Sequence, residues 1–244
     1  MENILSVLDQ QGFGTAPGVV LHRRIAGEGD LLLTLFLKGV GMIRVSARGA
    51  AGGKVRFGGG TEPLVWGNFG LYRGRGGSCH LKSVDVADDF LTLRGRPEPL
   101  FAAIRWAKLL MRHLMAEHAA DDLLTSLYWD MKLLDRGDHP VDVVEFHFLW
   151  RWLKNWGLAP DLTACVRCGA RLTAALWTGD GLYCEPCAPP GEGWALSDRE
   201  LLNLRAVAGL KASAPAAWNE RSLSPSGNLF ATAKRRLESL LMEV

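Results

Sequence analysis

The sequence Cys165-Val-Arg-Cys168, followed after fifteen residues by Cys184-Glu-Pro-Cys187, decides how the C-terminal part of the chain folds. Two Cys-x-x-Cys pairs at this separation have the spacing of a four-cysteine zinc site. Each pair forms a tight knuckle, and two knuckles supply the tetrahedral set of sulfurs that Zn²⁺ prefers. The sequence therefore predicts one zinc ion per chain, with Cys165, Cys168, Cys184 and Cys187 as its ligands.

The residues between the two pairs predict a short hairpin, since Leu172, Leu176 and Trp177 are followed by Gly179 and Gly181. Four thiolates leave the metal no open position for water or substrate, which indicates a structural role. The alternative is a redox dithiol, which needs only one Cys-x-x-Cys pair in a βαβ context. The zinc module, at about residues 160–190, does not by itself name a function.

Length and composition are those of a folded protein. The chain has 244 residues, 48% of them hydrophobic and 22% charged, which is enough for two domains and the zinc module. The first residues lack the basic segment and apolar core of a secretory signal, and no apolar run is long enough to span a membrane. Clustered cysteines indicate metal binding in a reducing compartment, with Cys79 as a small buried hydrophobe. We expect a cytoplasmic protein.

Basic residues gather in the N-terminal third. Residues 10–80 contain nine Lys or Arg and three acids, although the whole chain has a net charge of only +2. The stretch between Asp30 and Glu62 has five bases and no acid: Lys38, Arg44, Arg48, Lys54 and Arg56. Such an excess favours a polyanionic partner, and these five residues are the predicted phosphate-contacting face. The alternative is an ordinary solvated basic surface.

Five segments of the N-terminal part have the alternation of strands and are separated by glycine-rich turns. They are residues 18–25, 31–38, 41–48, 61–72 and 78–86. Short antiparallel strands without an intervening helix predict a small barrel, with the OB-fold as the leading candidate. The fold class is therefore α+β: an OB-fold domain over residues 1–86, then an α-helical domain over residues 87–244 that carries the zinc module.

The glycine-rich loop of residues 49–60 does not match a phosphate-binding loop. That motif requires Ser or Thr after Gly-Lys, whereas Val55 follows Lys54 here, and no helix is expected next. A Gly-x-Gly-x-x-Gly fingerprint is also missing from the sequence. The missing fingerprint argues against a dinucleotide-binding deacetylase, despite the similar zinc insert of such enzymes.

The hydrophobic period becomes helical from Pro97 onward. We expect helices from Pro97 to about Glu117, from Asp121 and Asp122 as caps to Leu134, from Pro140 to Trp156, from Ser197 to about Ala212, and from Ser226 to Met242. The third is apolar almost all round and should be buried, with Gly157 as its C-terminal cap. Ser197 and Glu200 have the spacing of a capping box.

The sequence shows no constellation typical of catalysis. His113 and His118 are five residues apart and share a helix face poorly, and His147 has the place of a packing residue. Asp85, Asp88 and Asp89 could hold a metal, but a solvated turn is the favoured interpretation. We expect a protein that is not an enzyme; a metal site with fewer than four protein ligands would support a zinc-containing hydrolase instead.

Several segments together resemble the RecO family of recombination mediators. They are Gly18-Val-Val-Leu-His-Arg-Arg24, Gly27-Glu-Gly-Asp30, Lys38 to Gly49, Glu62-Pro-Leu64, and Trp156 to Gly169 with its first cysteine pair. The resemblance covers nearly the whole chain in the same order. The family's basic loop is richer in Lys and Arg than residues 49–60 are here.

The resemblance implies a DNA-repair protein that binds single- and double-stranded DNA and anneals complementary strands. With RecR it would help load the RecA recombinase onto DNA covered by single-strand-binding protein (SSB), in the cytoplasm and associated with the nucleoid. It also implies that the acidic, apolar C-terminal tail of SSB docks on the helical domain. Arg105, Lys108 and Arg112, spaced three and four apart, are the expected partner-binding stripe; ordinary solubilising charges are the alternative.

Two further interpretations stay open beside this one. The aromatic residues Phe57, Trp66 and Tyr72 could stack on bases, although aromatic residues of a barrel usually belong to its core. A non-catalytic, zinc-containing scaffold that binds an acidic protein through the basic barrel is the alternative function.

Overall fold

The computed structural model describes residues 7–51, 56–74, 76–191, 193–214, 217–218 and 228–243. The chain forms two compact units, Met1–Arg136 and Gly137–Val244. Among the described helices, none has the length and apolar content needed to cross a membrane.

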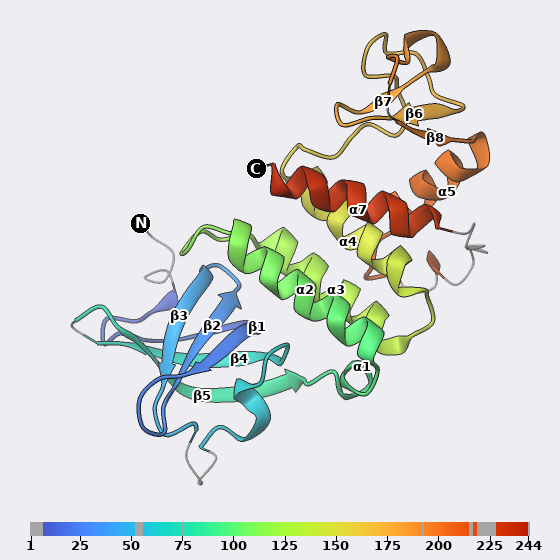
Figure 1. Cartoon of the computed structure of the whole chain (residues 1–244). Coiled ribbons are helices and arrows are strands. Elements are labelled where there is room, and N and C mark those ends of the chain that lie inside the picture. The colour runs from blue at the N-terminus through green and yellow to red at the C-terminus, as the bar shows by residue number, and fades with distance from the viewer. Residues whose placement is uncertain are drawn as a thin grey trace. The chain divides into compact units, whose positions relative to one another are not determined.

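The first unit is built on a closed five-stranded barrel (Figure 1). Its strands are β1 (Phe13–Ile25), β2 (Leu31–Leu37), β3 (Gly41–Ala47), β4 (Trp66–Arg73) and β5 (Cys79–Asp88). The order around the barrel is β1-β2-β3-β5-β4, and the ladders are antiparallel except where β3 meets β5 in parallel through Ser46 and His80. The expected five-stranded barrel is confirmed, but the expectation that all strands are antiparallel is wrong at this closing contact.

Alternation places one set of side chains inside the barrel. In β3, Ile43, Val45 and Ala47 are buried in the core, whereas Arg44 points outward and is exposed. β2 is more buried: Phe36, on its outer side, has no exposed surface, and α3 packs against this strand within the same unit. The barrel therefore has one face covered by helices and one face open to solvent.

Strand bounds differ from expectation at two places. β1 begins at Phe13 and not Gly18, because residues 13–19 pair with β4 from Tyr72 back to Trp66. β4 begins at Trp66 and not Thr61, because residues 58–61 form the short 3₁₀ helix η2. The first difference comes from pairing between distant strands and the second from a local 3₁₀ turn, and alternation reveals neither.

Three helices complete the first unit: α1 (Leu91–Arg94), α2 (Pro97–His113) and α3 (Asp121–Arg136). α2 ends four residues before the expected Glu117, because the Glu117 N–H donates to Met42 O at 3.0 Å and so extends the edge of β3. Asp121 does not cap α3 with its side chain as expected. Its carboxylate instead accepts the Gly39 N–H at 2.8 Å, which fixes the β2–β3 turn to the start of α3.

The acidic cluster at the end of β5 is only partly a solvated turn. Asp85 and Asp89 are exposed, but Asp88 accepts hydrogen bonds from Tyr128 Oη at 3.0 Å and Lys132 Nζ at 3.1 Å. Asp88 therefore joins β5 to α3, a contact between residues forty apart that sequence spacing did not indicate.

The second unit packs α4 (Val141–Asn155) against α7 (Leu229–Met242), beside α5 (Asp198–Ala208). The side chains of residues 143–150 are all buried, as the apolar sequence predicted. His147 is a core residue: its Nε2 lies 3.0 Å from Leu210 O, so this nitrogen carries the proton. Glu145 is also buried, and it pairs with Lys234 of α7.

The helix ends of this unit follow the predicted signals. Gly157, at φ 73°, and Leu158 donate to Lys154 O and Leu153 O, which is a Schellman motif. Ser197 and Glu200 form the predicted capping box. α5 ends at Ala208 and not near Ala212, since Gly209 is a poor helix former. Ser226, the expected start of the last helix, lies outside the described residues.

Candidate metal centre and nucleic-acid interface

The four cysteines of the two Cys-x-x-Cys pairs meet at one point. The Sγ atoms of Cys165, Cys168, Cys184 and Cys187 all lie within 4.8 Å of one another, and Cys168 Sγ is 3.7 Å from Cys184 Sγ. Four sulfurs at about 2.3 Å from a tetrahedral ion are about 3.8 Å apart. The donor set and its spacing therefore fit a metal ion.

Local backbone geometry holds the knuckles in place. The Gly169 N–H donates to Cys165 O at 2.8 Å, and Gly169 has a φ of 71°, which lets the chain reverse directly after Cys168. The second pair lies on the 3₁₀ helix η3 (Glu185–Cys187), where the Cys187 N–H donates to Cys184 O. Each knuckle thus forms from short-range contacts.

Electrostatics at the cluster favour a cation. A hydrogen bond from the backbone of Cys184 is the main reason that the pKa of Cys165 is lowered to about 6. The neighbouring sulfurs of Cys184 and Cys168 raise the pKa of Cys187 to about 12. Four crowded thiols resist full ionisation by mutual repulsion, and a bound cation removes that obstacle.

A small sheet carries the cluster: β6 (Ala175–Trp177), β7 (Leu182–Tyr183) and β8 (Trp194–Leu196), in the order β7-β6-β8 (Figure 1). The expected hairpin is β6–β7, and β8 adds a third strand. Trp177 and Trp194 stack with ring centroids 5.8 Å apart. Arg205 of α5 donates to Leu162 O and Leu172 O, each at 2.8 Å, and so ties the module to the helices of its own unit.

The predicted phosphate-contacting residues do not form one compact cluster. Arg44 and Arg48 are exposed on the outer side of β3 and just beyond it, about 13 Å apart by strand geometry. Arg56 lies beside Arg48, since its guanidinium donates to Arg48 O at 3.3 Å. Lys38 is exposed at the opposite end of the β2–β3 hairpin. Lys54 lies outside the described residues.

The register of the barrel adds two basic groups that sequence reasoning missed. His80 pairs with Ser46, and Lys82 is exposed two residues further along β5. Burial lowers the pKa of His80, and the nearby charges of Arg48 and Lys82 lower it further. His80 and Lys82 are visible in the sequence, but their position beside β3 follows only from the parallel pairing of β3 with β5.

One base of the N-terminal segment is neutralised. Arg23 forms an ion pair with Glu62 at 2.6 Å, so its charge is shared with the loop that precedes β4. Arg24, the next residue of β1, is exposed, so basic side chains lie on β1 as well as on the outer side of β3 and β5.

The three aromatic residues considered for stacking have different environments. Phe57 packs in part against the barrel core, with the Arg56 guanidinium 5.1 Å from its ring. Trp66 is half-buried against Tyr128 of α3, with ring centroids 4.8 Å apart. Tyr72 is half-buried on the outer side of β4, because its neighbour Leu71 points into the core. Only Tyr72 of the three faces the open surface.

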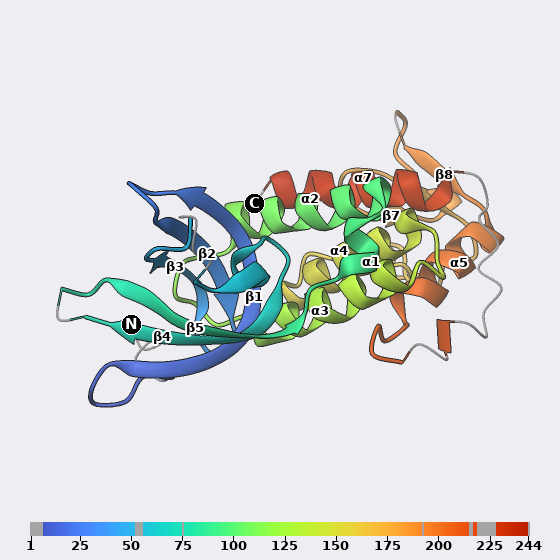
Figure 2. The ribbon, with the colours of Figure 1, turned by 90° about the horizontal axis from the view of Figure 1, so that it is seen from below.

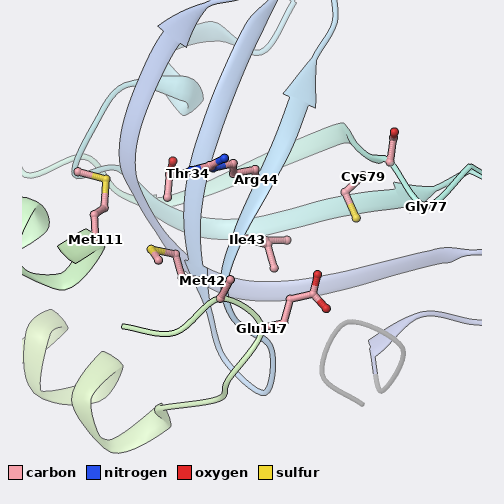
Figure 3. A pocket seen from close by; sticks show the side chains of 10 residues that line it. Thr34, Met42, Ile43, Arg44, Gly77, Cys79, Met111 and Glu117 are labelled. Carbon is pink, nitrogen blue, oxygen red and sulfur yellow. The ribbon is translucent and has the colours of Figure 1, made fainter. Parts of the chain in front are cut away.

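A cavity of about 490 Å³ lies beside Arg44, between the barrel and the segment after α2 (Figure 3). Met42 and Ile43 of β3 line it, with Met111 and Glu117 from the helical side and Cys79 of β5. It forms because β3 pairs with β5 only through Ser46 and then diverges toward Ala116. The cavity combines an apolar wall with one basic and one acidic side chain.

The expected partner-binding stripe on α2 is less exposed than predicted. Lys108 and Arg112 are exposed, but Arg105 is half-buried and has further interactions within the structure. Arg105 is turned inward because α2 packs against neighbouring elements of its unit. The hydrophobic period of α2 does not show where these elements lie.

Comparison with known proteins gives consistent matches. The family model described as "Recombination protein O N terminal" matches residues 13–90, and "Recombination protein O C terminal" matches residues 95–227. A relative named DNA repair protein RecO from Acetivibrio thermocellus is 27% identical over 180 residues, which span 72% of this chain and 71% of the relative.

Two further relatives carry the same name. One from an Exiguobacterium species is 31% identical over 152 residues, which span 62% of this chain and 60% of the relative. One from an Anaeromyxobacter species is 32% identical over 213 residues, which span 81% of this chain and 82% of the relative. The two family models together match the barrel and most of the helical region. This chain therefore belongs to the RecO family of DNA repair proteins.

Proposed function

We propose that this protein is a recombination mediator that binds single- and double-stranded DNA, anneals complementary strands, and acts with RecR to load RecA onto SSB-coated DNA. The single observation that carries the DNA-binding part is the open outer face of the barrel, where Arg44, Arg48 and Lys82 lie on neighbouring strands. Lysine and arginine on such a face contact phosphates without regard to base sequence. The protein would act in the cytoplasm, associated with the nucleoid, and without catalysing a covalent step.

The test is fluorescence anisotropy with labelled oligonucleotides at several salt concentrations. Replacing Arg44 and Arg48 by Glu should weaken binding to all sequences alike, and should flatten the log–log salt dependence by about 0.7 for each phosphate of a single strand that is no longer neutralised. The matched control reverses two exposed charges of the second unit, Lys154→Glu with Arg235→Glu. Unchanged binding by the Arg44/Arg48 variant would move the interface elsewhere. If the wild type binds no oligonucleotide, a scaffold for an acidic protein becomes the better interpretation.

The metal at the four cysteines is proposed to be one structural zinc ion per chain. Four thiolates suit Zn²⁺ and leave no position for a reacting water. Elemental analysis should find zinc at about one per chain, and Cys168→Ser should lower both the zinc content and the thermal stability. Cys79→Ser is the control, because Cys79 lies in β5 of the first unit, whereas the four clustered cysteines belong to the second. Protein purified without chelators that contains no zinc would contradict the assignment.

Docking of the SSB C-terminal tail on α2 is the least supported part of the proposal. Lys108 and Arg112 are exposed and could pair with the carboxylates of such a tail, while Arg105 is half-buried. Binding of a tail peptide should weaken in Arg105→Ala and Arg112→Ala variants that remain folded. Wild-type affinity in both variants would remove this stripe from consideration.

A further inference from the structure

A row of ring side chains crosses the open face of the barrel. Phe13 of β1 is paired with Tyr72 of β4, and Tyr72 is paired with His80 of β5. The Phe13 and Tyr72 ring centroids are 4.7 Å apart, and those of Tyr72 and His80 are 6.4 Å apart with nearly parallel planes. Directly paired residues on neighbouring strands share one face of a sheet, so the three rings form a continuous strip.

The strip faces outward and not into the core. Leu71 and Leu81, the neighbours of Tyr72 and His80, belong to the barrel core, and alternation then turns the two rings to the opposite side. Phe13 is 45% exposed, and with the half-buried Tyr72 and His80 it gives the outer face of the barrel a strip of rings that solvent can reach.

Basic side chains border the same strip. Lys82 Nζ lies 4.9 Å from the centre of the Tyr72 ring, and Arg48 is close enough to lower the pKa of His80. His80 is in turn paired with Ser46 of β3, so the strip runs directly into the strand that carries Arg44. Three strand spacings of about 4.8 Å separate Phe13 from β3, a length of about 14 Å.

A groove of about 470 Å³ lies beside Tyr72, the middle ring of the strip. It is lined by Tyr72, Arg73 and the residues before β1, including Gln10 and Gln11. Asp9 also lines it, but its carboxylate accepts the N–H groups of Gln11 and Phe13, each at 2.9 Å. The groove thus offers amide groups and a guanidinium beside an aromatic ring. It opens close to the β4–β5 hairpin, which projects from the barrel in Figure 2.

We infer that Phe13, Tyr72 and His80 form a stacking platform for the unpaired bases of single-stranded DNA, with Lys82 and Arg48 holding the adjacent phosphates. The inference rests on the proposed DNA-binding function and specifies which part of the DNA each side chain contacts. Flat rings take any base, since every base has a π-face, and neighbouring cations hold the backbone. Duplex DNA keeps its bases stacked inside the helix, so it can use the cations but not the rings.

The test compares three labelled DNAs in fluorescence anisotropy: a single-stranded oligothymidylate, an abasic strand of equal length, and a duplex. The variants are Phe13→Ala alone and Phe13→Ala with Tyr72→Leu, each checked for an unchanged thermal unfolding midpoint. Affinity for the oligothymidylate should fall about fivefold to hundredfold, as expected when base stacking is removed. Affinity for the abasic strand and for the duplex should stay at the wild-type level.

Two controls make the result specific. Tyr72→Phe keeps the ring and should bind the oligothymidylate as the wild type does. Phe101→Ala removes an exposed ring from α2 and should also leave binding unchanged. Equal decreases on all three DNAs, or wild-type affinity of the double variant for the oligothymidylate, would overturn the platform while leaving DNA binding intact. A wild type that binds none of the three would overturn the proposed function itself, and the platform with it.

Discussion

At the scale of single residues, two glycines of the β2–β3 turn have different tasks. Gly39 and Gly41 both have positive φ, 71° and 87°. A Cβ on Gly41 would meet His118 O at 2.1 Å, whereas one on Gly39 would meet only Val7 Cγ1 at 4.0 Å. Gly41 is therefore required for a close approach as well as for its conformation.

We predict that Gly41→Ala destabilises the protein more than Gly39→Ala. Both variants incur about 1–2 kcal/mol for a side chain in the left-handed region. Gly41→Ala should cost about 1–3 kcal/mol more, because the backbone at His118 must move. Urea unfolding of the two variants checks the difference. Equal destabilisation would show that the His118 contact is not tight in solution.

The imidazole of His80 should make stability depend on pH. Burial, with the charges of Arg48 and Lys82, lowers its pKa in the folded state below the ordinary value of 6.5. As pH falls below about 6.5, the unfolded chain binds a proton that the folded state resists, so stability decreases. The unfolding free energy of His80→Gln should therefore drop less between pH 7.5 and 5.5 than that of the wild type. His22→Gln, an exposed position on β1, is the control, and an identical drop in all three proteins would contradict the prediction.

Helix caps could be predicted from the sequence where the interacting residues are close together in the chain. The capping box of Ser197 and Glu200 and the glycine cap at Gly157 join residues within one turn of each other, so spacing alone predicts them. Asp121 had the right residue type for a helix cap, yet its carboxylate binds the Gly39 N–H from a segment eighty-two residues away. Only the fold brings that donor within reach.

At the scale of elements, one partly buried ammonium joins α4 to α7. Lys234 forms an ion pair with Asp142 at 2.6 Å and another with Glu145, whose side chain is fully buried. Burial alone would lower the pKa of Lys234, but the hydrogen bonds to Asp142 and Glu145 outweigh it and raise the pKa. Lys234 therefore keeps its positive charge at the interface between α4 and α7.

We predict that Lys234→Met destabilises the protein by about 3–5 kcal/mol, the usual effect of removing one partner of a buried ion pair. Adding Glu145→Gln to that variant should restore part of the stability, because the buried negative charge is then removed as well. Lys154→Met, on the exposed side of α4, should have little effect. Denaturant unfolding of the three variants measures this, and a double variant less stable than Lys234→Met would contradict the explanation.

Element types were more predictable than their ends. The strands β2 and β3 were placed to within one residue, because regular alternation marks both of their ends. The start of β1 was missed because Gly14 and Pro17 are poor strand formers, and pairing with β4 overrides that preference. In the same way, α2 ends early because Ala116 and Glu117 join the edge of β3.

At the scale of the whole molecule, the clustering of the four cysteines and the family were the features best predicted from sequence. The four cysteines lie together as their spacing required. The proposed DNA-binding surface could be foreseen only in part, because Arg44 and Arg48 lie in and just beyond one strand, whereas Lys82, His80, Tyr72 and Phe13 come beside them through barrel closure. Residues gathered from several strands leave no spacing pattern in a single sequence.

The boundary between the two halves of the chain leads to the last prediction. The expected OB-fold domain ends at residue 86, close to the end of the barrel at Asp88, whereas the first compact unit extends to Arg136. α3 contributes Tyr128, whose ring lies 4.8 Å from that of Trp66 and whose hydroxyl donates to Asp88. Phe36, on the outer side of β2, is completely buried. A barrel cut at residue 88 would expose these side chains to water.

We therefore expect a fragment of residues 1–136 to unfold cooperatively and to bind single-stranded DNA, and a fragment of residues 1–88 to aggregate. The shorter fragment lacks the helices that cover Phe36 and Trp66, which leaves an apolar patch on a small domain. Circular dichroism melting and size-exclusion chromatography distinguish the two fragments, and anisotropy measures their binding. A monomeric, cooperatively folded 1–88 fragment would show that the barrel is stable alone and that α1–α3 are not needed for its fold.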